Sequence, residues 1–292
     1  MSDLGTEEID TILQQAESTP THSTLKGKQI ALLFYENSTR TYNSFRTAVH
    51  RQGGLTCGFA GTGGTSVLKG ESLHDTIKMF EEYADAIILR HPNDGACRWA
   101  ADVSQVPVIN AGDGQNQHPT QTLLDLLAIK RTQGRLNNLK VALVGDLKHG
   151  RTIRSLSQAL SLYPGNELFL VSPKSLQLPI EQLEHLQARG TRIQVCQLED
   201  VMSEIDICYV TRIQKERMTD PESYAQVQGA YRLEAKDLDT AKKSMKILHP
   251  LPRVDEISQD VDHTIHAHYF EQAKGGVSIR RALLELLLGE GL

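Results

Sequence analysis

The run Ile30-Ala-Leu-Leu-Phe-Tyr35 leads into the turn Ser38-Thr39-Arg40-Thr41, and Tyr42-Asn-Ser-Phe-Arg-Thr-Ala-Val-His-Arg51 follows. The apolar run predicts a strand and the last stretch predicts a helix. Between them, unpaired backbone N–H groups, three side-chain hydroxyls and a guanidinium surround one point. Because such donors hold a phosphate dianion, this stretch predicts that the chain binds a phosphorylated small molecule. The alternative is a Ser/Thr helix cap beside a surface arginine.

Short apolar runs alternate with amphipathic segments along the rest of the chain, which indicates an α/β fold with mainly parallel sheets flanked by helices. The expected strands are 30–34, 55–59, 86–89, 106–110, 141–144, 167–171, 192–195, 205–210 and 245–248. A helix is expected over 119–130, followed by a polar link at 133–138. We therefore predict two domains, 1–133 and 134–275, with an apolar C-terminal helix in 276–292 that packs back on the first domain.

The composition limits the class of protein. The 292 residues carry a formal net charge of −5 and the pI is about 6.1, which argues against a nucleic-acid or anionic-membrane binder. No apolar run reaches the roughly 18 residues that span a bilayer, and the acidic start does not resemble a signal peptide, so we expect a cytoplasmic protein. The cysteines form no Cys-x-x-Cys pair and are expected as buried thiols; they are Cys57, Cys97, Cys196 and Cys208.

Several polar side chains follow predicted strands, where parallel sheets bind ligands at their carboxyl ends. Arg90 closes the third strand, and His118 precedes Pro119, which suits the first position of a helix. Arg212 and Gln214 follow a later strand, and such a pair suits a carboxylate. The alternatives are a solvated turn arginine, a capping or packing histidine, and a solvated charged loop.

The segment Gly145-Asp-Leu-Lys-His-Gly150-Arg151-Thr152 is close to the phosphate loop Gly-x-x-x-x-Gly-Lys-Ser/Thr, but Arg151 stands where that loop has lysine. Because the planar guanidinium suits a carboxylate or phosphate edge, we expect an arginine presented to an anionic substrate. A nucleotide-binding switch is the alternative. His263, His266 and His268 have no carboxylate or thiol partner at a convincing spacing, so no metal site is expected.

The turn His249-Pro250-Leu251-Pro252-Arg253 follows the last expected strand. Its two prolines fix an irregular backbone whose carbonyl groups cannot all join a helix or sheet. Such a turn can direct a backbone oxygen at the amine of a ligand. By itself it indicates only a rigid turn.

Seven segments in this order resemble the family of aspartate carbamoyltransferase catalytic chains, and the resemblance covers nearly the whole sequence. They are 34–41, 66–71, 90–92, 110–125, 145–152, 212–217 and 249–256. The resemblance implies transfer of the carbamoyl group of carbamoyl phosphate to the amine of L-aspartate in pyrimidine synthesis, without a cofactor. It also implies that 1–133 binds carbamoyl phosphate and that 134–275 binds aspartate.

The resemblance implies roles for individual residues. The phosphate is held by Ser38, Thr39, Arg40 and Thr41, and the carbonyl oxygen is polarised by Thr41, Arg90 and His118. The carbamoyl NH2 group and the attacking amine meet Gln121 and the backbone around Leu251 and Pro252. The two carboxylates of aspartate are taken by Arg151, Arg212 and Gln214.

The family also implies a homotrimer with shared active sites, in which Ser66 and Lys69 enter the site of the neighbouring chain. Lys69 is then expected at the aspartate, and Thr65 rivals Ser66 for the serine's role, because the loop is one residue shorter than in some relatives. Glu36, with Arg151 and Arg217 as partners, is expected to bridge the domains on closure. A separate regulatory chain and allosteric control are possible additions.

The nearest alternative is an ornithine-type carbamoyltransferase. Those enzymes carry a cysteine in the late turn and an acidic loop for a basic amino acid, whereas here position 250 is proline and Arg212 lies in the corresponding loop. An arginine there favours an acidic co-substrate. The short lead-in usual for the family is missing before the first expected helix, so whether Met1 is the native start stays open.

Overall fold

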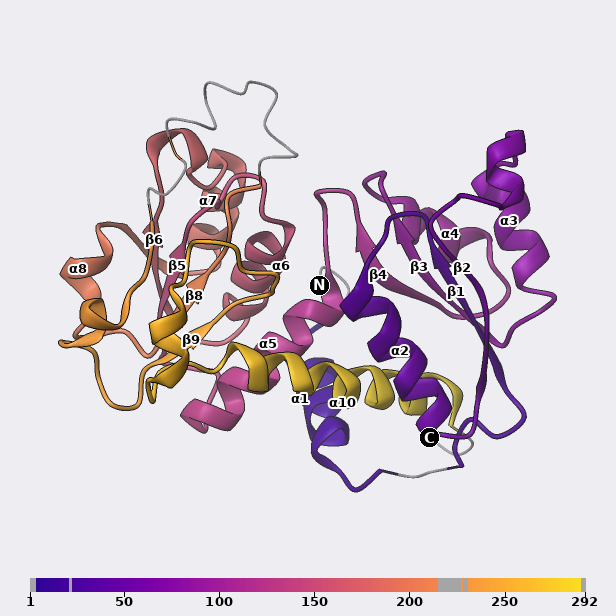
Figure 1. Cartoon of the computed structure of the whole chain (residues 1–292), viewed down its shortest axis with the longest axis horizontal. Helices are drawn as coiled ribbons and strands as arrows, with labels where there is room; N and C mark the ends of the chain where they lie inside the picture. The colour runs from indigo at the N-terminus through magenta and orange to yellow at the C-terminus, as the bar shows by residue number, and fades with distance from the viewer. Residues whose placement is uncertain (1–3, 21–22, 215–226, 228–230, 290–292) are drawn as a thin grey trace. The chain divides into compact units, whose positions relative to one another are not determined.

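A computed structural model describes residues 4–20, 23–214, 227 and 231–289, which form two compact units (Figure 1). The first unit comprises 7–123 and 275–292, and the second comprises 1–6 and 124–274. This division falls inside helix α5 (Pro119–Gln133) and helix α10 (Tyr269–Leu288). The domain boundary at 133 that the sequence predicts stays a prediction.

The first unit is built on a parallel sheet in the order β2-β1-β3-β4. Its strands are β1 (Gln29–Phe34), β2 (Leu55–Ala60), β3 (Ala86–His91) and β4 (Val108–Asp113). Its helices are α1 (Thr6–Glu17), α2 (Thr39–Arg51), the 3₁₀ helix η1 (Ser66–Lys69), α3 (Leu73–Phe80) and α4 (Ala96–Val103). This order places β1 and β3 in the middle of the sheet.

Both faces of this first sheet are covered by helices, which is why β1 reads as a continuous apolar run. Ile30 and Leu32 pack with Phe45 of α2 on one face. Leu33 packs with Ile77 of α3 on the other face. Alternate residues of a strand point to opposite faces, so β1 supplies both cores at once.

The C-terminal part of α10 packs in the core of the first unit, as the sequence predicts. Leu284 is fully buried in the cluster that includes β1 and α2, and Val277 and Leu288 pack against it. The helix begins at Tyr269 rather than near Val277. Its start was hidden by Gly275 and the glycine after it, because glycine disfavours helix interiors.

The second unit contains a parallel sheet in the order β7-β6-β5-β8-β9. Its strands are β5 (Lys140–Val144), β6 (Glu167–Val171), β7 (Arg192–Val195), β8 (Ile207–Val210) and β9 (Lys246–Leu248). Its helices are α6 (Arg151–Leu160), η2 (Lys174–Leu176), α7 (Ile180–Ala188), α8 (Leu198–Val201), η4 (Ala235–Leu238) and η5 (Gln259–His263). The two parallel sheets with flanking helices confirm the predicted fold class.

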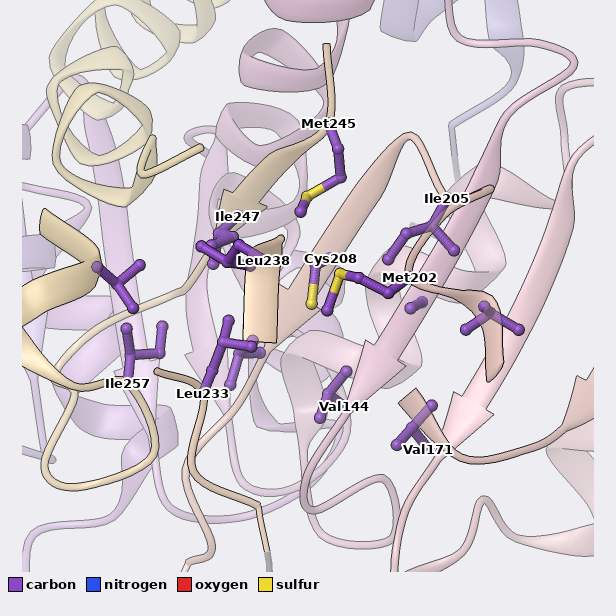
Figure 2. Close-up of a cluster of buried hydrophobic side chains, with 14 of the residues drawn as sticks. Val144, Val171, Met202, Ile205, Cys208, Leu233, Leu238, Met245, Ile247 and Ile257 are labelled. Atoms are coloured by element: carbon purple, nitrogen blue, oxygen red, sulfur yellow. The ribbon is translucent and has the colours of Figure 1, made fainter. Parts of the chain in front are cut away.

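Figure 2 shows the apolar cluster on one face of this second sheet. Val144, Val171, Cys208 and Ile247 come from four neighbouring strands and lie in one layer. Side chains from the segments that cover the sheet complete the cluster: Met202, Ile205, Leu233, Leu238, Met245 and Ile257. This packing holds the strand ends, and the loops that follow them, in fixed positions.

The cysteines agree only in part with the expectation of buried thiols. All four are free; Cys97 and Cys208 are buried, whereas Cys57 and Cys196 are half-buried. Burial raises the pKa of the Cys208 thiol to about 12, so it stays protonated. Within the described residues, no helix combines the length and the apolar character needed to cross a membrane.

Candidate active site

The turn after β1 forms an open helix N-terminus. Ser38 is the N-cap residue of α2 with an extended backbone, and its side chain makes no capping hydrogen bond. The Tyr42 N–H donates to the Ser38 carbonyl oxygen at 3.2 Å, as the first backbone hydrogen bond of the helix. The preceding N–H groups have no intrahelical acceptor and point out of the helix end. The serine hydroxyl and these N–H groups are therefore arranged to receive an anion.

Arg40 and Thr41 add a charge and a second hydroxyl to the same turn. Thr41 is buried, with 6% of its surface exposed. Partial desolvation lowers the pKa of Arg40, but an arginine keeps its charge at neutral pH. A partly desolvated cation interacts more strongly with a bound anion than a fully solvated one.

Arg90 lies beside this turn because β3 pairs with β1. Arg90 is the partner of Phe34 in the parallel register, and the Tyr35 N–H donates to the Arg90 carbonyl oxygen at 2.9 Å. The Arg90 side chain is only 12% exposed, with its Nε 3.5 Å from Oε2 of Glu36. Its Nη1 donates to the Ala111 carbonyl oxygen at 3.3 Å, which aims the guanidinium across the strand ends.

His118 follows β4 and is 5% exposed. Helix α5 begins at Pro119, as predicted, and the Gln121 N–H donates to the His118 carbonyl oxygen at 3.0 Å. The turn before His118 is organised by the buried carboxylate of Asp113. Its oxygens accept hydrogen bonds from the Gly95 N–H, the Asn110 Nδ2, the Asn116 Nδ2 and the Gln117 N–H, at 2.9 to 3.1 Å. The sequence alone does not single out Asp113.

The loop after the edge strand β2 holds Ser66 and Lys69 on the 3₁₀ helix η1. Both residues are exposed. The Thr65 hydroxyl donates to the Thr62 carbonyl oxygen at 2.8 Å within the loop. Ser66 therefore presents its hydroxyl to solvent, whereas that of Thr65 is engaged.

In the second unit, the turns after β5 and β8 are joined closely. Gly145 has φ +109°, and a Cβ there would lie 2.2 Å from the Thr211 carbonyl oxygen, so only glycine fits. The carboxylate of Asp146 is fully buried and accepts the N–H groups of His149 at 3.0 Å and Gln214 at 3.3 Å. Arg151 is the first residue of α6 and follows this turn directly.

Three of the predicted residues follow the carboxyl ends of two adjacent strands: Arg151, Arg212 and Gln214. Arg151 comes from the β5 turn, and the other two come from the turn after its neighbour β8. The sequence alone does not single out Asp146, the carboxylate that ties the two turns together. Arg217, which is predicted to take part in domain closure, lies outside the described residues.

The turn after β9 presents backbone oxygens. Leu251 has φ +56°, and its N–H donates to Nδ1 of His249 at 2.8 Å. Pro250 and Pro252 have no N–H to donate. Of the residues that the structure describes, none donates a hydrogen bond to the carbonyl oxygen of Pro250 or Leu251. These two oxygens are therefore open to donors of a ligand.

Comparisons with known proteins identify the family of the chain. Residues 1–131 match the model of the carbamoyl-P binding domain of aspartate/ornithine carbamoyltransferase, and residues 137–287 match its Asp/Orn binding domain. The chain belongs to the aspartate/ornithine carbamoyltransferase family.

Relatives of this carbamoyltransferase include the aspartate carbamoyltransferase catalytic subunit of Thermococcus onnurineus, 50% identical over 98% of this chain and 95% of that protein. The catalytic subunit of M. jannaschii aspartate transcarbamoylase is 49% identical, with a TM-score of 0.90 over 98% of this chain and 96% of that chain. The aspartate transcarbamoylase of Trypanosoma cruzi, solved with carbamoyl phosphate and aspartate, is 36% identical. Its TM-score is 0.92 over 99% of this chain and 95% of that chain.

Proposed function

We propose that this carbamoyltransferase is the catalytic chain of an aspartate carbamoyltransferase, which makes N-carbamoyl-L-aspartate and phosphate. The observation that carries the proposal is the placement of Arg151, Arg212 and Gln214 at the ends of the adjacent strands β5 and β8. Two guanidinium groups and an amide suit a dicarboxylic acceptor. The side chain of ornithine would bring an ammonium group to the same cations, which repel it.

The first unit supplies the groups for carbamoyl phosphate. The open N-terminus of α2 with Ser38, Thr39, Arg40 and Thr41 suits the phosphate. Thr41, Arg90 and His118 then surround the carbonyl oxygen, where negative charge grows as the amine attacks. Donors placed there in advance stabilise the transition state more than the ground state.

The chemical step forms one bond and breaks one. The amine nitrogen of aspartate attacks the carbamoyl carbon, the C–O bond to phosphorus-bound oxygen breaks, and the electron pair leaves with phosphate. One amine proton is released to phosphate or solvent. The side chain of Gln121 and the carbonyl oxygens around Leu251 and Pro252 would hold the carbamoyl NH2 group and the attacking amine in line.

The assembly is part of the same proposal. Ser66 and Lys69 stand exposed on a loop at the edge of the sheet, as residues that complete a neighbour's site would have to be. We therefore include a homotrimer with shared sites, a place in pyrimidine synthesis and a cytoplasmic location. Control by a separate regulatory chain remains compatible with it. On closure, Glu36 would pair with Arg151 and Arg217, which would exclude water from the site.

The test is release of phosphate from carbamoyl phosphate with L-aspartate or L-ornithine as acceptor, run beside a native mass measurement. We expect aspartate-dependent phosphate release that matches carbamoyl-aspartate formation, and the mass of three chains or a multiple of it. Phosphate release with ornithine but not with aspartate would favour the ornithine-type alternative. Binding of a nucleoside triphosphate, without transfer of a carbamoyl group to either amino acid, would favour the nucleotide-binding switch instead.

A further inference from the structure

His249 lies behind the turn that presents the two open carbonyl oxygens, and it is 1% exposed. Its Nδ1 accepts the Leu251 N–H at 2.8 Å, and its Nε2 lies 2.7 Å from Oε1 of Glu256. A ring nitrogen that accepts a hydrogen bond carries no proton. The proton of the neutral ring must therefore sit on Nε2, where it is donated to Glu256.

Glu256 is buried and keeps its charge. Its second oxygen, Oε2, accepts the N–H groups of Val254 and Asp255, both at 3.1 Å. Burial raises the pKa of Glu256, but the hydrogen bond from His249 and the backbone hydrogen bonds outweigh burial and leave the pKa lowered. The carboxylate is thus a fixed acceptor for the ring.

Several groups act on the protonation of His249. Burial lowers the pKa of His249, the positive charges of Arg253 and Arg212 lower it further, and the opposing effect of Glu256 is smaller. The ring is therefore neutral at neutral pH. Both ring nitrogens are occupied and the side chain has almost no solvent access, so it is not placed to exchange a proton with a substrate.

The backbone of His249 is also held. Its N–H donates to Oε1 of Gln272 at 2.8 Å, and Nε2 of Gln272 donates to Oδ1 of Asp125 at 2.6 Å. The other oxygen of Asp125 accepts the Tyr209 hydroxyl at 2.8 Å. These side chains are at most 1% exposed, so the histidine is fixed from the backbone and from the ring.

The ring controls the direction of the open oxygens through peptide geometry. The Leu251 N–H and the Pro250 carbonyl belong to one planar peptide, so a bond to the first orients the second. Leu251 also adopts the left-handed conformation, which costs a residue with a side chain about 1–2 kcal/mol unless its surroundings hold it. Its N–H bond to His249 supplies such a hold, and this in turn sets the Leu251 carbonyl.

We infer that His249, braced by Glu256, is a positioning residue that aims the Pro250 and Leu251 carbonyl oxygens at the carbamoyl NH2 group and the attacking amine. The inference rests on the proposed function, which places those groups at this turn. The histidine takes no proton in the reaction. Its contribution is the orientation of two acceptors before the substrates arrive.

Two substitutions of His249 test the roles of Nδ1 and Nε2 separately. In His249→Asn, the short amide can accept the N–H two residues on, as asparagine does in Asx turns, and so replace Nδ1. In His249→Gln, the longer amide reaches toward Glu256 but leaves the Leu251 N–H without its acceptor. We expect His249→Gln to lose on the order of 100-fold in kcat, as misplaced groups do, with little change in the KM for aspartate. His249→Asn should recover most of that loss.

The pH profile gives a readout that stability alone would not move. Protonation of Nδ1 at low pH would break the Leu251 bond, so the wild-type kcat should fall as pH drops through the lowered pKa of His249. The His249→Asn enzyme should lack this acid limb. Glu256→Gln keeps an acceptor for the ring, and it should retain far more kcat than His249→Gln.

The outcomes are distinct. Wild-type enzyme that does not carbamoylate aspartate would overturn the proposed function and this role with it. Active wild-type enzyme with an unimpaired His249→Gln variant would overturn the positioning role alone. If the Asn and Gln variants lost the same amount of kcat as each other, and their urea midpoints fell by the same amount, His249 would be shown to act only through packing. A Glu256→Gln enzyme more impaired than His249→Gln would indicate acid–base chemistry instead.

Discussion

Replacing Arg281 by methionine should destabilise the first unit strongly. The Arg281 guanidinium is 7% exposed and binds both oxygens of Glu285, at 3.1 and 2.8 Å. It also donates to the carbonyl oxygens of Gln15, Ala16 and Ser18 at the C-terminal end of α1, at 2.8 to 3.2 Å. Methionine leaves the Glu285 carboxylate buried without its cation, and removing one partner of a buried pair costs about 3–5 kcal/mol.

The magnitude can be read in urea. With a slope of about 1–3 kcal/mol per molar, a loss of 3 kcal/mol moves the unfolding midpoint down by about 1 M or more. Trp99 is the single tryptophan and lies on α4, so its fluorescence follows the unit that contains Arg281. Measurements at one protein concentration keep any effect of assembly constant.

Two further variants sharpen this measurement. Lys274→Met removes an exposed ion pair with Glu271 on the same helix, and it should leave the midpoint unchanged. Arg281→Met combined with Glu285→Leu removes both buried charges, and much of the lost stability should return. A single Arg281→Met variant within about 1 kcal/mol of wild type would contradict the assigned role of this pair in tying α10 to α1.

Three other outcomes are expected. Arg212→Ala should raise the KM for aspartate far more than the KM for carbamoyl phosphate, and unchanged aspartate saturation would remove Arg212 from the acceptor site. Gly145→Ala forces a Cβ to within 2.2 Å of the Thr211 carbonyl oxygen, so it should lower thermal stability and raise the aspartate KM together; a neutral result would show that the turn can move apart. Mixing inactive Arg40→Ala and Lys69→Ala chains should restore some turnover if sites are shared, whereas self-contained sites would give none.

The strands β1, β5, β6 and β8 could be predicted from sequence because each contains a short apolar run that is buried. β1 is the clearest case, since Ile30 to Phe34 are all buried and no polar residue interrupts them. The predicted strand boundaries differ from the observed ones where the apolar run and the hydrogen-bonded segment do not coincide. β4 begins at Val108 rather than Val106, because Pro107 cannot donate a ladder hydrogen bond.

The supporting residues of the site could not be found in the same way. Asp113 ends strand β4, and Asp146 and Glu256 lie in loops. Most carboxylates at such positions are solvated. Each is buried here because backbone N–H groups from more than one position converge on it. That convergence depends on which loops become neighbours, and neither periodicity nor composition records it.

The strand orders explain why the predicted donors fall into two groups. From β1 the chain adds β2 on one side and β3 with β4 on the other, so its connections diverge between β1 and β3. From β5 the chain adds β6 and β7 on one side and β8 with β9 on the other. Loops that leave such a pair of strands in opposite directions open a crevice at the carboxyl ends, where ligands bind.

In the first sheet, the divergence lies between the Ser38 turn and Arg90, and in the second it lies between the Arg151 and Arg212 turns. In the proposed function, each unit therefore has its anion site at its own topological switch point, one suited to a phosphate and one to a carboxylate. A single point change cannot exchange these specificities, because each is set by two loops on adjacent strands. Converting the acceptor from aspartate to ornithine should therefore require changes in both the β5 and the β8 loops, and a variant altered only at Arg212 should lose aspartate turnover without gaining ornithine turnover.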